Sequence, residues 1–203
     1  MTPSAPPFCP WGIAPLLAFH SRRWPAQNES LADLSTQARQ EPSTIFERSN
    51  MRGHATGSCL IIDPRSMRAL EILHKATGMW LPPGGHADPG ETPLQAALRE
   101  AAEEVGADPA LLRSFPGLEA GGGLLDIDTH PIAANARKGE GVHRHHDFAF
   151  AFTVHGAFDP VLATGEVGAS RWQPIADMLL GADPRPRRLG AKLIELSGSA
   201  GLL

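Results

Sequence analysis

Three glutamates recur at helical spacing in the segment 93–105, and this arrangement is the first feature that could support chemistry. Glu100, Glu103 and Glu104 fall on one face of a helix, because side chains three and four positions apart are neighbours. The carboxylates repel one another there, and they lie in the last two turns, where the helix dipole disfavours anions. Arg99 supplies one positive charge, which we expect to point away from the centre of the acidic face. A solvated acidic surface would also give this pattern, but a bound divalent cation would offset the repulsion, and clustered carboxylate oxygens suit Mg²⁺ or Mn²⁺.

The helix that carries these glutamates has start and stop signals. Thr92 is a hydroxyl N-cap, Pro93 occupies the first helical position, and Gln95 stands where a capping box places it. Gly106 is placed to end the helix. The apolar side chains of the segment form a separate stripe, at Leu94, Ala97, Leu98, Ala101 and Val105. The pattern therefore predicts a helix with one face in the core and an acidic face elsewhere.

Histidines form a second group of residues that could do chemistry. The chain has nine, of which His86 precedes the acidic helix, while His143, His145 and His146 come directly before an expected strand at 147–154. If that strand lies beside the acidic helix, the imidazoles approach the same cleft. Three interpretations stay open: scattered surface histidines, a phosphate-binding group and a second metal site.

The elements that must position these residues indicate a mixed α/β fold. Pro82 to Gly85 is expected to be a break in the chain, and residues 1–27, which are rich in proline, an irregular arm. Two short helical pieces are expected at 28–50, and a closing helix at 186–197. Strands are expected at 57–62, 69–74, 80–81, 124–127, 147–154 and around Trp172. We therefore divide the chain into an N-terminal extension (1–52) and a main domain (53–203).

Composition narrows the class of protein. The 203 residues include 21 glycines and 19 prolines, which argues against a coiled coil or a long helical bundle. The net charge of −4 argues against a generic nucleic-acid surface. Two cysteines, Cys9 and Cys59, are too few for a disulfide scaffold, so we expect reduced thiols in the cytoplasm. The apolar stretch 11–19 is too short to span a bilayer, and we expect no membrane partner.

The residues around the acidic helix resemble the sequence box of the Nudix hydrolase (MutT-like) family, G-x5-E-x7-R-E-U-x-E-E-x-G-U. The two aliphatic positions of the box are held by small residues, Ala101 and Ala107. All seven fixed positions match, at Gly85, Glu91, Arg99, Glu100, Glu103, Glu104 and Gly106. A chance match at seven fixed positions is expected on the order of once in a million chains of this length. With the order of the elements, the resemblance covers about residues 55–200.

The resemblance implies a Nudix-type α/β/α sandwich, in which the box forms a loop–helix–loop beside a mixed sheet. It implies hydrolysis of a diphosphate bond in a nucleoside diphosphate linked to another moiety, with Mg²⁺ or Mn²⁺ as cofactor. This chemistry fits the residue types, because metal ions neutralise the diphosphate oxygens and a carboxylate can accept the proton of the attacking water. The substrate is expected to be a small molecule of nucleotide type, and a homodimer is one alternative for the assembly.

Carried over position by position, the resemblance implies that Glu100, Glu103 and Glu104 bind metal and that one of them activates water. It further implies that the backbone carbonyl of Gly85 binds metal. Glu91 and Arg99 are implied as supporting residues that orient the acidic cluster. These roles belong to the box itself.

Outside the box the resemblance implies further candidates. Some family members take another glutamate ligand from a loop before the last strand, and Glu166 matches best, with an exposed loop glutamate as the alternative. The run 126–132 and the histidines after it resemble a bacterial Nudix subgroup. The residues that would line the substrate pocket are then Asp126, Asp128, His130 and Asp147, together with His86, His143 and His145.

Two other activities are alternatives to hydrolysis. Isopentenyl diphosphate isomerase has a Cys-x-His segment in the corresponding loop, and His86 matches its metal-binding histidine, but Gly84 stands where the cysteine is needed. A ligand-sensing module on the same scaffold usually lacks box carboxylates, whereas this chain has all of them. Hydrolysis is therefore the favoured prediction.

Overall fold

The computed structural model describes residues 12–136 and 139–201. Its strands are β1 His54–Asp63, β2 Arg68–His74, β3 Met79–Leu81, β4 Gly84–His86, β5 Leu112–Ser114, β6 Leu124–Ile132, β7 His143–Val154 and β8 Val167–Pro174. The α-helices are α1 Ile13–Arg23, α2 Ala32–Gln40, α3 Pro93–Val105, α4 Ile175–Met178 and α5 Pro184–Ala200. Short 3-10 turns lie at η1 Pro25–Gln27, η2 Glu29–Leu31, η3 Thr44–Phe46, η4 Pro109–Leu111 and η5 Glu119–Gly121. In the described residues, no helix combines the length and apolar character that crossing a membrane would require.

The strands form one mixed sheet in the order β3-β2-β1-β7-β5, with β4 paired to β1, β6 to β7 and β8 to β2. The central pair, β1 and β7, runs parallel from His54 opposite His145 to Ile62 opposite Thr153. Every other pairing is antiparallel. The predicted mixed α/β fold is confirmed.

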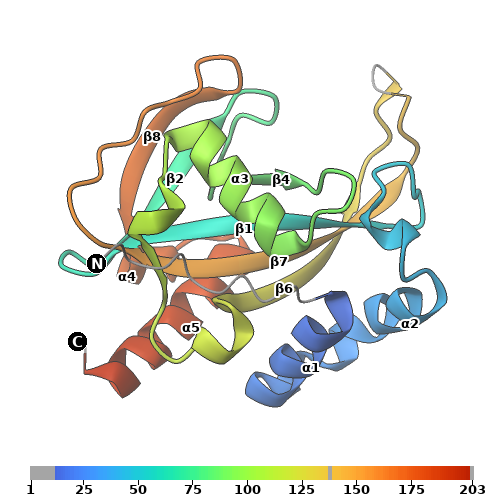
Figure 1. Cartoon of the computed structure of the whole chain (residues 1–203), viewed down its shortest axis with the longest axis horizontal. Helices are drawn as coiled ribbons and strands as arrows, with labels where there is room; N and C mark the ends of the chain where they lie inside the picture. The colour runs from blue at the N-terminus through green and yellow to red at the C-terminus, as the bar shows by residue number, and fades with distance from the viewer. Residues whose placement is uncertain (1–11, 137–138, 202–203) are drawn as a thin grey trace.

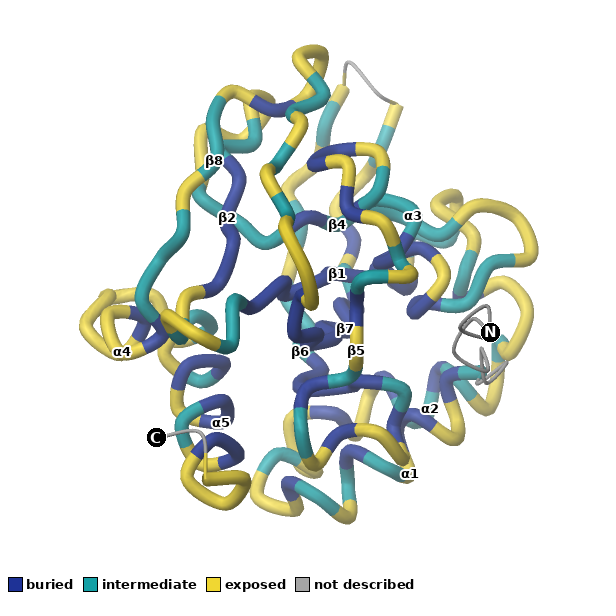
Figure 2. The backbone as a smooth tube through the Cα atoms, turned by 60° about the vertical axis from the view of Figure 1, so that its left-hand side comes forward, coloured by how far each residue is buried: buried dark blue, intermediate teal, exposed yellow. Residues whose placement is uncertain are grey.

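Helices cover both faces of this sheet. Successive side chains of a strand point to opposite sides, and β1 has apolar side chains on both. Along β1, Cys59 and Ile61 belong to the apolar cluster that includes α1, α2 and α3, whereas Leu60 and Ile62 belong to the one that includes α4 and α5. Figure 1 shows α3 across β1, with α1 and α2 together at one corner and α5 at another. Figure 2 shows the buried residues concentrated along β1 and its neighbours.

The acidic helix α3 is held tightly at its start. Thr92 accepts a hydrogen bond from the Gln95 amide, and the Gln95 side chain accepts one from the Thr92 amide, so the predicted capping box is confirmed. Gly106 ends the helix in the left-handed conformation, with φ of 68°. Gly57 of β1 lies so close to this helix that a Cβ there would be 2.1 Å from the Pro93 carbonyl oxygen. The backbone of β1 is therefore in direct contact with α3.

The expectation of an irregular arm at 1–27 is wrong over Ile13–Arg23, which form α1; residues 1–11, with Cys9, lie outside the described part. Pro15 does not break this helix, because it stands in the first turn, where backbone N–H groups have no helical partner. Ile13, Leu16, Leu17 and His20 are buried, which is a helical period. The helix packs against η5 and β6 of the main domain. The boundary at residue 53 stays a prediction.

Candidate active site

The loop expected as a break at Pro82–Gly85 in fact returns to the sheet. Residues Gly84–His86 form β4, which pairs antiparallel with β1, with Gly85 opposite Gly57. The glycines allow this because a Cβ on Gly84 would be 2.6 Å from the Gly57 carbonyl oxygen. A Cβ on Gly85 would be 2.3 Å from Oε1 of Glu100. The box loop is thus packed between the sheet and the acidic helix.

The three box glutamates differ in their environment. Glu104 is buried, and its Oε2 accepts a hydrogen bond of 2.9 Å from the Gly84 amide. The Glu100 side chain is 15% exposed and that of Glu103 is 60% exposed. Burial, followed by repulsion from the neighbouring glutamates, raises the pKa of Glu104 to about 7. Burial also raises the pKa of Glu100, against the opposing effect of Arg99. Burial and mutual repulsion therefore both disfavour negative charge on Glu100 and Glu104.

Arg99 lies at the acidic face, so the expectation that it points away is wrong. Its Nη1 donates to Glu100 and to Glu103, each at 3.0 Å, and its Nε donates to Glu91 at 3.0 Å. Its Nη2 donates to the carbonyl oxygen of His86 at 2.9 Å. The long side chain and the planar fork of the guanidinium let one residue reach all these acceptors. The hydrogen bond with Glu91 is the largest cause of the raised pKa of Arg99. Burial raises the pKa of Glu91, but the hydrogen bond with Arg99 helps to bring that pKa below its usual value.

Glu166 reaches the same cleft from the loop before β8. It is exposed, and its charge contributes to the raised pKa values of Glu100 and Glu104. Its backbone is held by hydrogen bonds, since the Lys75 amide donates to its carbonyl oxygen at 2.9 Å and its own amide donates to Ala163. The structure therefore brings Glu166 close to the box carboxylates.

These residues open onto a large cleft of about 1250 Å³. On the carboxylate side it is lined by Gly85, Glu100, Glu104 and Glu166. Basic side chains line it as well, notably Arg185 and Arg188 from the first turns of α5. Neither arginine is among the site residues predicted from the sequence. Carboxylates and guanidinium groups therefore line the same cleft.

The predicted pocket aspartates hold these arginines. Asp147 is buried and accepts from the hydroxyls of Thr56 and Ser58, each at 2.8 Å, and from Arg185. Asp128 accepts from Arg188 at 2.7 Å. Both aspartates line the cleft.

Asp126 has a different place. It is completely buried and does not belong to the residues that line the cleft. It accepts hydrogen bonds from Lys192 at 2.6 Å, Arg188 at 2.8 Å and Gln27 at 3.2 Å. Burial raises the pKa of Asp126, but the neighbouring His20, Lys192 and Arg188 outweigh this effect and hold the pKa far below its usual range. Asp126 thus joins α5 and the N-terminal segment to β6.

The histidine cluster belongs to the sheet rather than to a loop before it, because β7 begins at His143. His86, His130 and His145 line the cleft, whereas His143 is buried behind it. His146 points to the other side, where its Nε2 lies 3.1 Å from the side-chain oxygen of Gln37. Burial and the surrounding imidazoles lower the pKa of His145 to about 2. His54, which sequence reasoning missed, joins the cluster from the start of β1.

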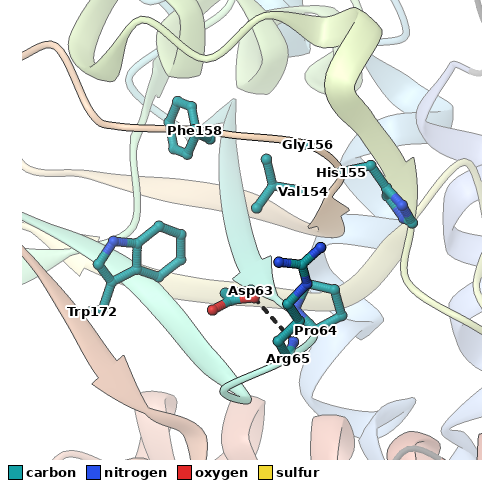
Figure 3. Close-up of a pocket in the computed structure, with 8 residues that line it drawn as sticks. All are labelled: Asp63, Pro64, Arg65, Val154, His155, Gly156, Phe158 and Trp172. Atoms are coloured by element: carbon teal, nitrogen blue, oxygen red, sulfur yellow. Dashed lines mark hydrogen bonds between the residues drawn. The ribbon is translucent and has the colours of Figure 1, made fainter.

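A smaller hollow of about 260 Å³ lies at the other end of β1 (Figure 3). Figure 3 shows Asp63 and Arg65 on one side of it and Trp172 and Phe158 on the other. It contains none of the predicted site residues. The large cleft is therefore the candidate active site.

Comparison with known proteins gives a family match. A NUDIX domain model matches residues 51–193. The asymmetrical bis(5'-nucleosyl)-tetraphosphatase of Sus scrofa is 53% identical over 48 residues, which are 23% of this chain and 33% of that protein. A putative 8-oxo-dGTP diphosphatase of Bacillus subtilis is 38% identical over 58 residues, 29% of this chain and 39% of that protein. The chain thus spans about a third of the length of the curated relatives that it matches.

Two solved structures share the fold. An Ap4A hydrolase binary complex from C. elegans has a TM-score of 0.54 at 19% identity, covering 71% of this chain and 98% of that one. The dihydroneopterin triphosphate pyrophosphohydrolase of E. coli has a TM-score of 0.55 at 22% identity, covering 70% of this chain and 95% of that one. At these identities the likeness concerns the fold alone.

Proposed function

This chain belongs to the Nudix family, and from that premise we propose that it hydrolyses a diphosphate bond in a nucleoside diphosphate linked to another moiety, by attack of water. The observation that carries the proposal is the crowding of Glu100, Glu103 and Glu104 on α3, beside Gly85 and open to a cleft with basic side chains. A surface that was merely solvated would not bury Glu104 or raise its pKa.

The carboxylates fit a divalent cation. Arg99 pairs with Glu91, Glu100 and Glu103, but within the described residues no basic side chain pairs with Glu104. Hard oxygen donors of this kind suit Mg²⁺ or Mn²⁺. We propose Glu100, Glu103, Glu104, Glu166 and the Gly85 carbonyl as the ligand set. When bound, the cation supplies neutralisation of the diphosphate charge and a lower pKa for a bound water.

The side chains of the protein would then divide the remaining work. One glutamate of the cluster accepts the proton of the attacking water. Arg99 and Glu91 hold the carboxylates in place, because Arg99 donates hydrogen bonds both to Glu91 in the box loop and to Glu100 on α3. Arg185 and Arg188 offer guanidinium groups to the phosphate oxygens, a pairing that suits their planar donors. Asp128 and Asp147 keep those two arginines at the cleft.

The substrate proposal is a small molecule of nucleotide type. It draws on the names of the relatives, a bis(5'-nucleosyl)-tetraphosphatase and a putative 8-oxo-dGTP diphosphatase, and on the cleft volume of about 1250 Å³. We also propose a cytoplasmic location and no nucleic-acid partner, with a homodimer as one alternative for the assembly.

A release assay tests the proposal. The purified chain is incubated with Mg²⁺ or Mn²⁺ and dinucleoside polyphosphates, ADP-ribose, coenzyme A, NADH and oxidised nucleoside triphosphates, and nucleotide and phosphate products are measured. We expect mononucleotide products from at least one class, and their loss in Glu104→Gln. His155→Gln is a matched control, since His155 is exposed and outside the cleft.

Two other results would replace the proposal. Tight binding of a nucleotide without products would indicate a sensing module. Rearrangement of isopentenyl diphosphate would indicate an isomerase, although Cys59 is fully buried and burial raises the pKa of its thiol to about 12. A buried, protonated thiol does not suit that chemistry.

A further inference from the structure

Four imidazoles gather on one face of the sheet, and we call them the imidazole cluster: His54, His86, His143 and His145. The pairing of the strands places them there. The parallel register of β1 and β7 sets His54 opposite His145, and His143 shares its face because it lies two residues earlier. On β4, His86 is opposite Thr56, two residues after His54. The cluster is thus a product of three strands.

The ring nitrogens converge on a small space. His54, His143 and His145 each offer a nitrogen within 4.8 Å of the other two. Nε2 of His145 lies 3.2 Å from Nε2 of His143 and 3.3 Å from Nε2 of His86. Two nitrogens bound tetrahedrally to one zinc ion at about 2.0–2.1 Å lie about 3.3 Å apart. The His143–His145 pair therefore has the spacing of two ligands around one ion, and a nitrogen of His54 lies within 4.8 Å of both.

Hydrogen bonds at the outer nitrogens orient two of these rings. Nδ1 of His143 lies 2.8 Å from the Gly141 carbonyl oxygen, and Nδ1 of His54 lies 3.2 Å from that of Asn50. A carbonyl oxygen only accepts, so each Nδ1 carries a hydrogen, and in the neutral ring each Nε2 then has a lone pair. Histidine ligands of metal ions typically donate their other ring hydrogen to a carbonyl or carboxylate in this way.

The cluster does not satisfy itself by hydrogen bonds. His54 is completely buried, and its Nε2 has no hydrogen-bond partner among the described residues. A buried nitrogen without a hydrogen-bond partner is unfavourable, and a cation bound at Nε2 of His54 would supply that partner.

We propose that the imidazole cluster is a metal site for a borderline ion of the Zn²⁺ type, bound by His54, His143 and His145. Nitrogen donors distinguish this site from the carboxylates, because imidazole suits zinc, nickel and copper rather than Mg²⁺. His86 and His145 line the cleft, so the open position of a three-histidine site would face the substrate, an orientation that rests on the proposed function.

Metal binding by the full chain without a histidine tag tests the site directly. Chelator-treated protein is titrated with Zn²⁺ against a chromogenic chelator, and the visible spectrum is recorded after addition of Co²⁺. We expect one Zn²⁺ per chain and a tetrahedral Co²⁺ spectrum. His145→Gln should weaken Zn²⁺ binding by at least about a hundredfold, since losing even an outer partner costs about 10–100-fold.

The controls separate this site from the active site. His155→Gln and Glu104→Gln should bind Zn²⁺ as the unaltered chain does, the first because His155 lies outside the cluster and the second because Glu104 serves the other site. The proposal is overturned if the unaltered chain binds no stoichiometric Zn²⁺ or gives only an octahedral Co²⁺ spectrum. It is equally overturned if a folded His145→Gln binds Zn²⁺ normally. The unaltered chain alone decides the question if that variant does not fold.

Discussion

Gly85→Ala is the substitution that most directly tests whether the box loop sets the position of the Glu100 carboxylate, which we propose as a metal ligand. An ideal Cβ at this position lies 2.3 Å from Oε1 and 2.7 Å from Cδ of Glu100, whereas ordinary contact begins at 3.4 Å. The carboxylate must therefore withdraw by about 1 Å. That movement also strains its hydrogen bond of 3.0 Å with Arg99.

A displacement of about 1 Å at a reacting group costs on the order of a hundredfold in rate. We expect Gly85→Ala to lower turnover on the substrate found by the release assay by about that factor, at saturating Mg²⁺. Turnover and the thermal unfolding midpoint are measured together, so that a loss of rate in a folded protein can be recognised.

Gly181→Ala is the matched control, because a Cβ there meets nothing within 4 Å. It should leave turnover unchanged. If folded Gly85→Ala turns over within about threefold of the unaltered chain, the position of the Glu100 carboxylate does not govern the reaction, and the assignment of Glu100 as a metal ligand fails.

Three further predictions concern charge. Folded Glu103→Gln and Glu104→Gln should each reduce turnover more than roughly a hundredfold in the release assay, and near-normal rates would contradict the proposed function. Asp126→Asn should lower the free energy of unfolding in urea by about 3–5 kcal/mol, because it leaves the buried Lys192 ammonium, now 2.6 Å from the carboxylate, without its counter-ion; an unchanged midpoint would refute this. Burial lowers the pKa of His20 in the folded chain below the usual value of 6.5. Below pH 6.5 the unfolded chain therefore takes up a proton more readily than the folded chain, so the folded state loses stability as the pH falls. The fall in unfolding free energy from pH 7.5 to pH 5.5 should therefore be smaller in His20→Gln, and equal slopes would exclude this role.

The acidic helix could be predicted from the sequence because its signals are local. Thr92, Gln95 and Gly106 act within one or two turns, and the spacing of the glutamates determines their common face. The course of the Arg99 side chain could not be predicted, since its acceptors Glu91 and the His86 carbonyl lie on a loop whose return to the sheet is a tertiary contact.

The other side of the cleft depends on contacts between distant residues. His54 meets His145 only through the parallel register of β1 and β7, which no local pattern encodes. For the arginines of α5 a local signal did exist. Arg185, Arg187 and Arg188 crowd the first two turns of a helix, where the dipole disfavours cations as it disfavours anions at the end of α3. Arginines crowded at the start of a helix therefore indicate nearby anionic partners, just as the glutamates at the end of α3 indicate a cation.

The two charged sides of the cleft come from opposite parts of the main domain, and this sets an order of events during synthesis. Glu104 leaves the ribosome 84 residues before Arg188, which at about 5–20 residues per second is a delay of roughly 4–17 seconds. In that interval β7, which pairs with β1 and carries the aspartate that holds Arg185, has also to be synthesised. A nascent chain therefore exposes its carboxylates before the arginines that line the other side of the cleft have been made, and the cleft is complete only after α5 has docked.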